Sequence, residues 1–187
     1  MNMIEVSNLT KNYGKFTAVK DISFDLAQGS IVGFVGKNGA GKTTTIRCML
    51  DMLKPTAGTI RVKGLDAQND SKKIKSFLGY MPGDTCFYEH IRCKDIFDLF
   101  CAISKVPQEK AQALCAYFEL DQNKKFKDLS LGNKKKVSII QALLKETELL
   151  ILDEPTSGLD PLMHMKFFDL LLEQKKQGVT IFYHLTI

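Results

Sequence analysis

The residues with the clearest chemistry form a glycine-rich run, Gly36-Lys37-Asn38-Gly39-Ala40-Gly41-Lys42-Thr43, which Thr44 follows. The run matches G-x-x-x-x-G-K-[ST] in full, the pattern of a loop that cradles nucleotide phosphates. Its glycines let successive backbone N–H groups face phosphate oxygens, and a following helix adds the positive end of its dipole. Lys42 is expected to reach the β- and γ-phosphates, and the Thr43 hydroxyl to ligate Mg²⁺.

A second candidate site follows the apolar run Leu149–Leu152, which ends in the carboxylates Asp153 and Glu154. A buried strand that ends in acids places them at the carboxyl edge of a sheet, beside a phosphate loop. Asp153 is predicted to support Mg²⁺ through water. Glu154 is predicted to act as general base on the water that attacks the γ-phosphate, or at least to orient it.

Alternating strands and helices must position these two sites. The near-continuous apolar run Ile31–Val35 predicts a parallel strand that is buried on both faces and leads into the phosphate loop. A helix is expected over Lys42–Leu53, ended by Pro55 and Gly58. The same patterns predict further strands at Met3–Val6, Phe16–Leu26, Thr59–Val62, Phe77–Met81, Leu149–Leu152 and Val179–Tyr183, and helical structure over Arg92–Glu146, including a helix at Lys134–Glu146, and over Pro161–Lys176. This order predicts an open α/β sheet that carries a helical subdomain.

Length and composition restrict the class of protein. The chain has 187 residues and a net charge of +5, which suits one globular domain whose lysines lie mostly on solvated faces. No apolar run approaches the roughly 18 residues that span a bilayer, and the N-terminus lacks a secretory pattern, so we expect a cytoplasmic chain. The five cysteines form no CxxC pair, which predicts small buried hydrophobes in a reducing compartment rather than disulfides or a zinc site.

Taken together, the motifs resemble the nucleotide-binding domain of ATP-binding cassette (ABC) transporters over nearly the whole chain. Tyr13 matches the aromatic residue that stacks on adenine in this family. The phosphate loop comes next, and then three further motifs in the family's order: the signature segment Leu129-Ser130-Leu131-Gly132-Asn133, the strand end Asp153-Glu154-Pro155-Thr156, and the D-loop Ser157-Gly158-Leu159-Asp160.

The resemblance implies a P-loop NTPase fold, in the α/β class, with an N-terminal antiparallel β subdomain and an inserted helical subdomain. The nucleotide-binding core would comprise about 1–84 and 147–187, and the helical subdomain about 85–146. Two such domains, as a homodimer or a heterodimer, would sandwich ATP and Mg²⁺ head to tail. Each signature segment would then contact the partner protomer's ATP, with Ser130 and the Gly132 backbone meeting its γ-phosphate at a helix N-terminus.

The resemblance also implies partners and a place of action. Integral membrane permease subunits would receive the motion that ATP hydrolysis produces, so the chain would lie peripherally at the inner face of the cell membrane. Direct binding of nucleic acid is not expected. A Pro-Gly-acid sequence at Pro82-Gly83-Asp84 is similar to one branch of export-type members, which favours export.

Three motifs depart from the family pattern. Leu131 and Asn133 replace the usual Gly and Gln of the signature. Gly83 occupies the place of the Q-loop Gln, and whether Asp84 substitutes for that Gln stays open. His184 arrives about two residues earlier than the family's switch His. Either it reaches the pocket through an irregular turn, or the switch residue is absent; we expect absence, with His184 near solvent and the cassette truncated at its C-terminal end.

Two alternative functions follow from these departures and from the family's breadth. A truncated cassette would bind ATP with little or no turnover. A soluble ABC ATPase would act on ribosomes or DNA, but such members usually carry paired cassettes or long coiled coils, and this sequence has neither one.

Overall fold

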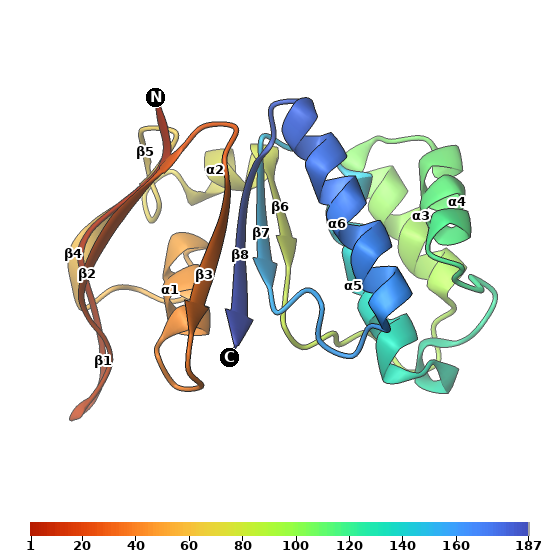
Figure 1. Ribbon diagram of the computed structural model, residues 1–187, viewed down its shortest axis with the longest axis horizontal. Helices are drawn as coiled ribbons and strands as arrows, with labels where there is room; N and C mark the ends of the chain where they lie inside the picture. The colour runs from red at the N-terminus through yellow and green to blue at the C-terminus, as the bar shows by residue number, and fades with distance from the viewer. Residues whose placement is uncertain (187) are drawn as a thin grey trace.

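The computed structural model describes residues 1–186, which form two four-stranded sheets with helices around the second sheet (Figure 1). The first sheet has the strand order β2-β1-β4-β5, and its strands pair antiparallel. The second has the order β3-β8-β7-β6, and its strands pair parallel. The predicted α/β fold with an antiparallel β subdomain is confirmed.

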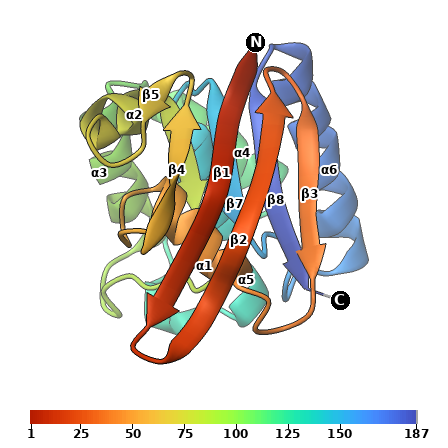
Figure 2. The same ribbon diagram turned by 90° about the vertical axis from the view of Figure 1, so that its left-hand side faces the viewer.

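A long hairpin dominates the antiparallel sheet (Figure 2). It joins β1 (Asn2–Tyr13) to β2 (Phe16–Ala27), and the short strands β4 (Ala57–Val62) and β5 (Leu65–Asp66) complete the sheet. The first strand extends well beyond the predicted Met3–Val6, because register shifts along β1 break the alternation of apolar and polar residues. The hairpin thereby brings Tyr13 opposite Phe16 at its tip.

The parallel sheet consists of β3 (Ile31–Gly36), β6 (Leu78–Met81), β7 (Leu149–Asp153) and β8 (Thr180–Thr186). Every residue of β7 is buried, as expected for a strand covered on both faces. The prediction that Ile31–Val35 is buried on both faces is wrong, because β3 lies at the edge of the sheet and Val35 is exposed. The last strand continues beyond the predicted Val179–Tyr183, since it pairs with β3 on one side and β7 on the other. This extension carries His184 into the sheet.

Helices pack on both faces of the parallel sheet (Figure 1). Helix α1 (Lys42–Met49) lies between the two sheets. It ends four residues before Leu53, where the sequence predicted its end. The predicted helical stretch after Arg92 is three helices, α3 (Cys93–Ser104), α4 (Gln108–Tyr117) and α5 (Leu131–Leu144), with a 3₁₀ turn at Phe126–Asp128. The last helix is α6 (Pro161–Lys176), as predicted, and the short α2 (Ser71–Phe77) was not predicted.

Two hydrophobic cores hold the parallel sheet between them. Alternate residues of its strands face opposite sides: Leu150 and Ile181 join the core beneath α3–α6, whereas Leu149 and Phe182 join the core beneath the antiparallel sheet. A rigid sheet therefore supports the loops at its carboxyl edge. Four cysteines are buried as expected, but Cys86 is exposed, contrary to that prediction. Over residues 1–186 no helix is both long and apolar enough to cross a bilayer.

Candidate functional site

The phosphate loop connects the end of β3 to the start of α1 and lies against the hairpin. Gly39 and Gly41 adopt φ values of 80° and 81°, a left-handed conformation that favours glycine. A Cβ at Gly41 would lie 2.4 Å from the carbonyl oxygen of Ala18 in β2. Glycine at position 41 therefore allows the left-handed backbone of the loop and also leaves room for the hairpin to pack closely against it.

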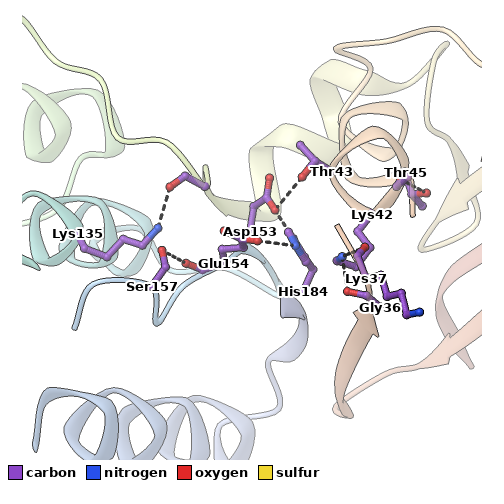
Figure 3. A network of polar contacts seen from close by, with 12 residues as sticks. Gly36, Lys37, Lys42, Thr43, Thr45, Lys135, Asp153, Glu154, Ser157 and His184 are labelled. Atoms are coloured by element: carbon purple, nitrogen blue, oxygen red, sulfur yellow. Dashed lines mark hydrogen bonds and ion pairs between the residues drawn. The ribbon is translucent and has the colours of Figure 1, made fainter. Parts of the chain in front are cut away.

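Lys42 is the first residue of α1 and is almost fully buried, with 5% of its surface exposed. Its Nζ donates hydrogen bonds to the carbonyl oxygens of Gly36, at 2.6 Å, and Lys37, at 2.8 Å (Figure 3). The ammonium is thus held by the loop that it follows, where phosphate oxygens can replace the carbonyls as acceptors.

A cavity of about 260 Å³ opens over the phosphate loop. Tyr13 from the tip of the hairpin lines it with a half-exposed ring. Its other lining residues come from β2, the phosphate loop and the strand ends: Phe16, Ala18, Asn38, Gly39, Ala40, Gly41, Lys42, Thr43, Thr44, Glu154 and His184. The structure therefore brings the loop residues 38–44 and Glu154 to one cavity, whereas the predicted Gly36 and Lys37 are not among the residues that line it. Sequence reasoning missed Phe16 and Ala18, although Phe16 stands directly opposite Tyr13 in the hairpin register.

Thr43 and Asp153 meet beside this cavity. The Thr43 Oγ1 donates to the Asp153 Oδ1 at 3.3 Å, and the Asp153 side chain is buried at the end of β7. A hydroxyl and a carboxylate are the oxygen donors that Mg²⁺ prefers when substrate phosphates complete its shell. Within residues 1–186, no group of three or more His, Cys, Asp or Glu could hold a metal. The pair thus fits Mg²⁺ held jointly with a nucleotide rather than by a protein cage.

Glu154 follows β7 with a φ of 48°, a sparsely populated conformation for a residue other than glycine. Its backbone N–H donates to the His184 carbonyl oxygen at 3.2 Å, which holds this turn. The Glu154 side chain is 38% exposed and lines the cavity over the phosphate loop. Strained backbone of this kind is characteristic of functional sites, where the surrounding fold holds it in place.

His184 lies inside the site, so the expectation that it stays near solvent is wrong. It stands opposite Asp153 in the β7–β8 register, with only 2% of its surface exposed. Its Nδ1 lies against the Asp153 Oδ1, and its Nε2 lies 3.4 Å from the Glu154 Oε1. A regular strand, rather than an irregular turn, delivers the imidazole, because β8 continues past Tyr183.

A second, smaller cavity of about 180 Å³ is also lined by the two carboxylates. Its lining combines residues of α1, β6, the following loop and the end of β7: Thr43, Arg47, Tyr80, Pro82, Gly83, Asp84, Asp153 and Glu154. Burial and the nearby Asp153 charge raise the pKa of Tyr80 to about 12, which keeps its hydroxyl protonated. A Cβ at Gly83 would lie 3.5 Å from the Asp153 carboxyl group, so the loop backbone passes close to that group.

The signature segment opens α5 on the exposed surface. Ser130 caps the helix by accepting a hydrogen bond from the Asn133 N–H at 3.3 Å, so α5 starts at Leu131 and not at the predicted Lys134. Leu131 is 73% exposed. In the described chain, residues 129–133 are not among those that line the cavity over the phosphate loop.

The D-loop packs directly against the signature segment. A Cβ at Gly132 would lie 2.7 Å from the Gly158 carbonyl oxygen. Asp160 caps α6 by accepting from the Met163 N–H at 2.9 Å, and this backbone hydrogen bond holds the pKa of Asp160 below its usual range. The structure thus brings two predicted motifs together, and residues 129–133 and 157–160 are not among those that line the cavity over the phosphate loop.

Comparison with known proteins places these motifs in context. A family profile described as "ABC transporter" matches residues 19–157. The chain is 36% identical over 185 residues to the bacitracin transport ATP-binding protein BcrA of Enterococcus faecalis, covering 96% of this chain and 60% of BcrA. It is 33% identical over 185 residues to the probable multidrug ABC transporter ATP-binding protein YbhF of Escherichia coli, covering 96% of this chain and 32% of YbhF.

Solved structures share the fold. The chain superposes on the ATP-binding subunit of an ABC transporter with a TM-score of 0.88 and 28% identity, covering 99% of this chain and 80% of that one. It superposes on a dimeric bacterial ABC transporter cassette with a TM-score of 0.87 and 24% identity, covering 97% and 87%. The chain therefore spans most of a solved cassette, but only about a third to three fifths of the two curated relatives.

Proposed function

The chain belongs to the ABC transporter family, as an ATP-binding cassette, and we propose that it hydrolyses MgATP at a dimer interface to power substrate export through separate membrane subunits. The observation that carries this proposal is the single cavity where Lys42, Glu154 and His184 meet. The three residues come from a helix start, a strand end and a neighbouring strand.

The phosphate loop, Tyr13, Thr43, Asp153 and Glu154 have distinct parts in the proposed reaction. Backbone N–H groups of the phosphate loop and the Lys42 ammonium bind the β- and γ-phosphates, while Tyr13 offers a ring for the adenine. Thr43 and Asp153 would hold Mg²⁺, which supplies charge neutralisation between the phosphates when bound. Glu154 orients the attacking water and accepts its proton.

His184 has a positioning part beside these groups. Its imidazole lies between the Asp153 and Glu154 carboxylates, within reach of both. From there it holds the Glu154 side chain over the cavity. We therefore propose that His184 is the switch residue, although the sequence analysis had favoured the absence of that residue.

The dimer is proposed from the placement of the signature segment. Ser130 and Gly132 begin a helix on an exposed surface, a position that favours an anion through backbone N–H groups and the helix dipole. The phosphate that would bind there belongs to a second protomer in this proposal. A solved cassette of this fold is itself a dimer, which supports the same arrangement.

The transport partners are proposed from the names of the relatives. BcrA serves bacitracin transport, and YbhF is described as a probable multidrug transporter protein. We propose membrane permease subunits as partners, with this cassette at the inner face of the membrane, where ATP is available. The division of the chain into a core, about 1–84 and 147–187, and a helical subdomain, about 85–146, is part of this proposal.

A cassette that binds ATP with little turnover is the second candidate. The glycine at position 83 and Leu131 in the signature favour it, since both replace polar or small groups that the family places near the reacting phosphate. This candidate binds ATP in the same cavity. It differs from the first only because it does not turn the bound ATP over to ADP and phosphate.

Phosphate release measured against protein concentration tests the proposal. Hydrolysis at a dimer interface predicts a specific activity that rises with concentration and then saturates, with a dependence on Mg²⁺. Tight ATP binding without phosphate release would favour the second candidate. Failure to bind ATP by calorimetry, or a specific activity independent of concentration, would overturn hydrolysis at a dimer interface.

A further inference from the structure

Lys135 is a buried lysine on the helix that begins with the signature segment. Only 4% of its surface is exposed, although it lies one turn past the Ser130 cap of α5. Its Nζ donates a hydrogen bond to the Gly83 carbonyl oxygen at 2.7 Å (Figure 3). A lysine side chain is rarely buried unless its charge is paired or hydrogen-bonded.

The surroundings of this ammonium are acidic. Burial lowers the pKa of Lys135, and the negative charges of Glu154, Asp153 and Asp84 act in the opposite direction. These carboxylates favour the charged form of the lysine, which in turn offsets the repulsion between the acids. Lys135 therefore lies within electrostatic reach of both carboxylates at the end of β7.

A second polar contact joins the same two segments. The Thr85 and Ser138 hydroxyl oxygens lie 2.6 Å apart, with Ser138 buried on α5. Positions 135 and 138 are three residues apart, so they share one face of the helix. The loop at 82–85 is thus attached to α5 at two successive points.

This loop is in turn close to the reacting groups. The Cβ position of Gly83 lies 3.5 Å from the Asp153 carboxyl group, and Gly83 itself lines the smaller cavity with Glu154. Because Gly83 has no side chain, this residue can act on these acids only through its backbone. The lysine that holds the Gly83 carbonyl therefore fixes how the loop meets them.

We propose that Lys135 is a positioning residue for hydrolysis: its buried ammonium fixes the Gly83 loop beside Asp153 and Glu154 and ties that loop to the signature helix. This inference rests on the proposed ATPase function. Lys135 does not line the described cavity over the phosphate loop, so its loss affects the chemical step more than ATP binding.

Lys135→Met tests the inference, with Lys145→Met as its matched control. Lys145 caps the other end of α5 and donates to the Lys75 carbonyl oxygen at 2.9 Å, and burial lowers the pKa of this lysine too. Both changes remove one lysine-to-carbonyl bond from the same helix. Only the first removes it beside the carboxylates.

Two measurements report on each variant. In steady-state ATPase assays, Lys135→Met is expected to lower kcat by about tenfold or more and to leave KM within about twofold, since small misplacements of catalytic groups are costly. In limited chymotrypsin digestion, cleavage at Phe87 or Tyr88 should become at least about threefold faster, because the loop has lost an attachment. Lys145→Met should change neither quantity.

The outcomes separate this inference from the proposed function. If the parent chain shows no ATP turnover, the proposed hydrolysis is overturned. The digestion experiment still decides whether Lys135 holds the loop. Unchanged kcat, a rise in KM alone, unchanged digestion, or equal losses in Lys145→Met would overturn the role of Lys135. If Lys135→Met does not fold, Lys135→Arg serves as the second variant. It should keep kcat within about threefold, because arginine retains the charge and the hydrogen-bond donor. A tenfold loss of kcat in folded Lys135→Arg would also overturn the role of Lys135.

Discussion

His184 and Asp153 stand opposite each other in the β7–β8 pair, and the imidazole Nδ1 lies against the Asp153 carboxylate while its Nε2 faces Glu154. The pairing makes the imidazole a bridge between the two strand-end acids. The register of the two strands places the ring at the edge of the cavity, next to both carboxylates. The position of Glu154 therefore depends on a residue thirty positions away in the sequence.

Replacing His184 should impair turnover more than binding. We expect His184→Ala to lower kcat for ATP by about tenfold or more, because the Glu154 carboxylate loses the neighbour that holds it over the cavity. His90→Ala is the control, since His90 is exposed and lies outside the site. Steady-state kinetics check the prediction, and equal rates for the two variants would contradict it.

Lys42→Ala should weaken nucleotide binding itself. The ammonium supplies a charge that the loop holds ready for phosphate oxygens, so we expect at least a tenfold loss in ATP affinity, which is about 1.4 kcal/mol. Titration calorimetry measures the affinity, with Lys20→Ala on the exposed part of β2 as the control. Parental affinity in Lys42→Ala would refute the assignment of the phosphate loop.

Glu154→Gln should separate binding from hydrolysis. The amide keeps the size of the side chain but cannot accept the proton of water, so turnover should fall by about 10²- to 10⁴-fold. ATP affinity should stay near that of the parent, and ATP-bound dimers should accumulate in size-exclusion chromatography. A variant that hydrolyses ATP at the parental rate would show that another group is the base.

Gly132→Ala should destabilise the contact between the signature segment and the D-loop. The added Cβ would lie 2.7 Å from the Gly158 carbonyl oxygen, so one segment must shift. We expect the free energy of unfolding to fall by about 1–3 kcal/mol, despite the better helix propensity of alanine.

Urea denaturation tests this effect, and Gly83→Ala is its matched control. A Cβ at Gly83 meets nothing closer than 3.5 Å, so that variant should keep its stability within about 0.5 kcal/mol. Equal stability of Gly132→Ala and the parent would contradict the prediction, because it would mean that the D-loop can move away from the added Cβ with no loss in the free energy of unfolding.

Thiol labelling should find one reactive cysteine in the native chain. Burial raises the pKa of Cys93 and Cys115 to about 11 and also raises the pKa of Cys48 and Cys101, so these thiols stay protonated at pH 8. Cys86 is exposed and should react alone with a maleimide. Mass spectrometry of the intact protein counts the adducts; five are expected after denaturation, and a second adduct on the native chain would contradict the burial.

Much of the fold and of the candidate site could be predicted from local sequence patterns. The phosphate loop and the Asp153-Glu154 strand end could be predicted because both depend on residues adjacent in the chain. Apolar runs such as Leu149–Leu152 likewise identified the central strands, whose burial on both faces leaves a continuous signal. Helix boundaries were less secure, since the cap at Ser130 depends on one side-chain hydrogen bond.

Contacts between distant segments were decided by the tertiary structure alone. His184 enters the site because strand pairing continues past Tyr183, and the register beside Asp153 follows from that pairing and from no local spacing. The approach of Lys135 to Gly83 likewise depends on how α5 packs beside the loop after β6. The sequence by itself determined which residues are candidates for binding phosphate and metal, whereas packing decided which charges surround them, because short-range patterns do not encode distances between segments far apart in the chain.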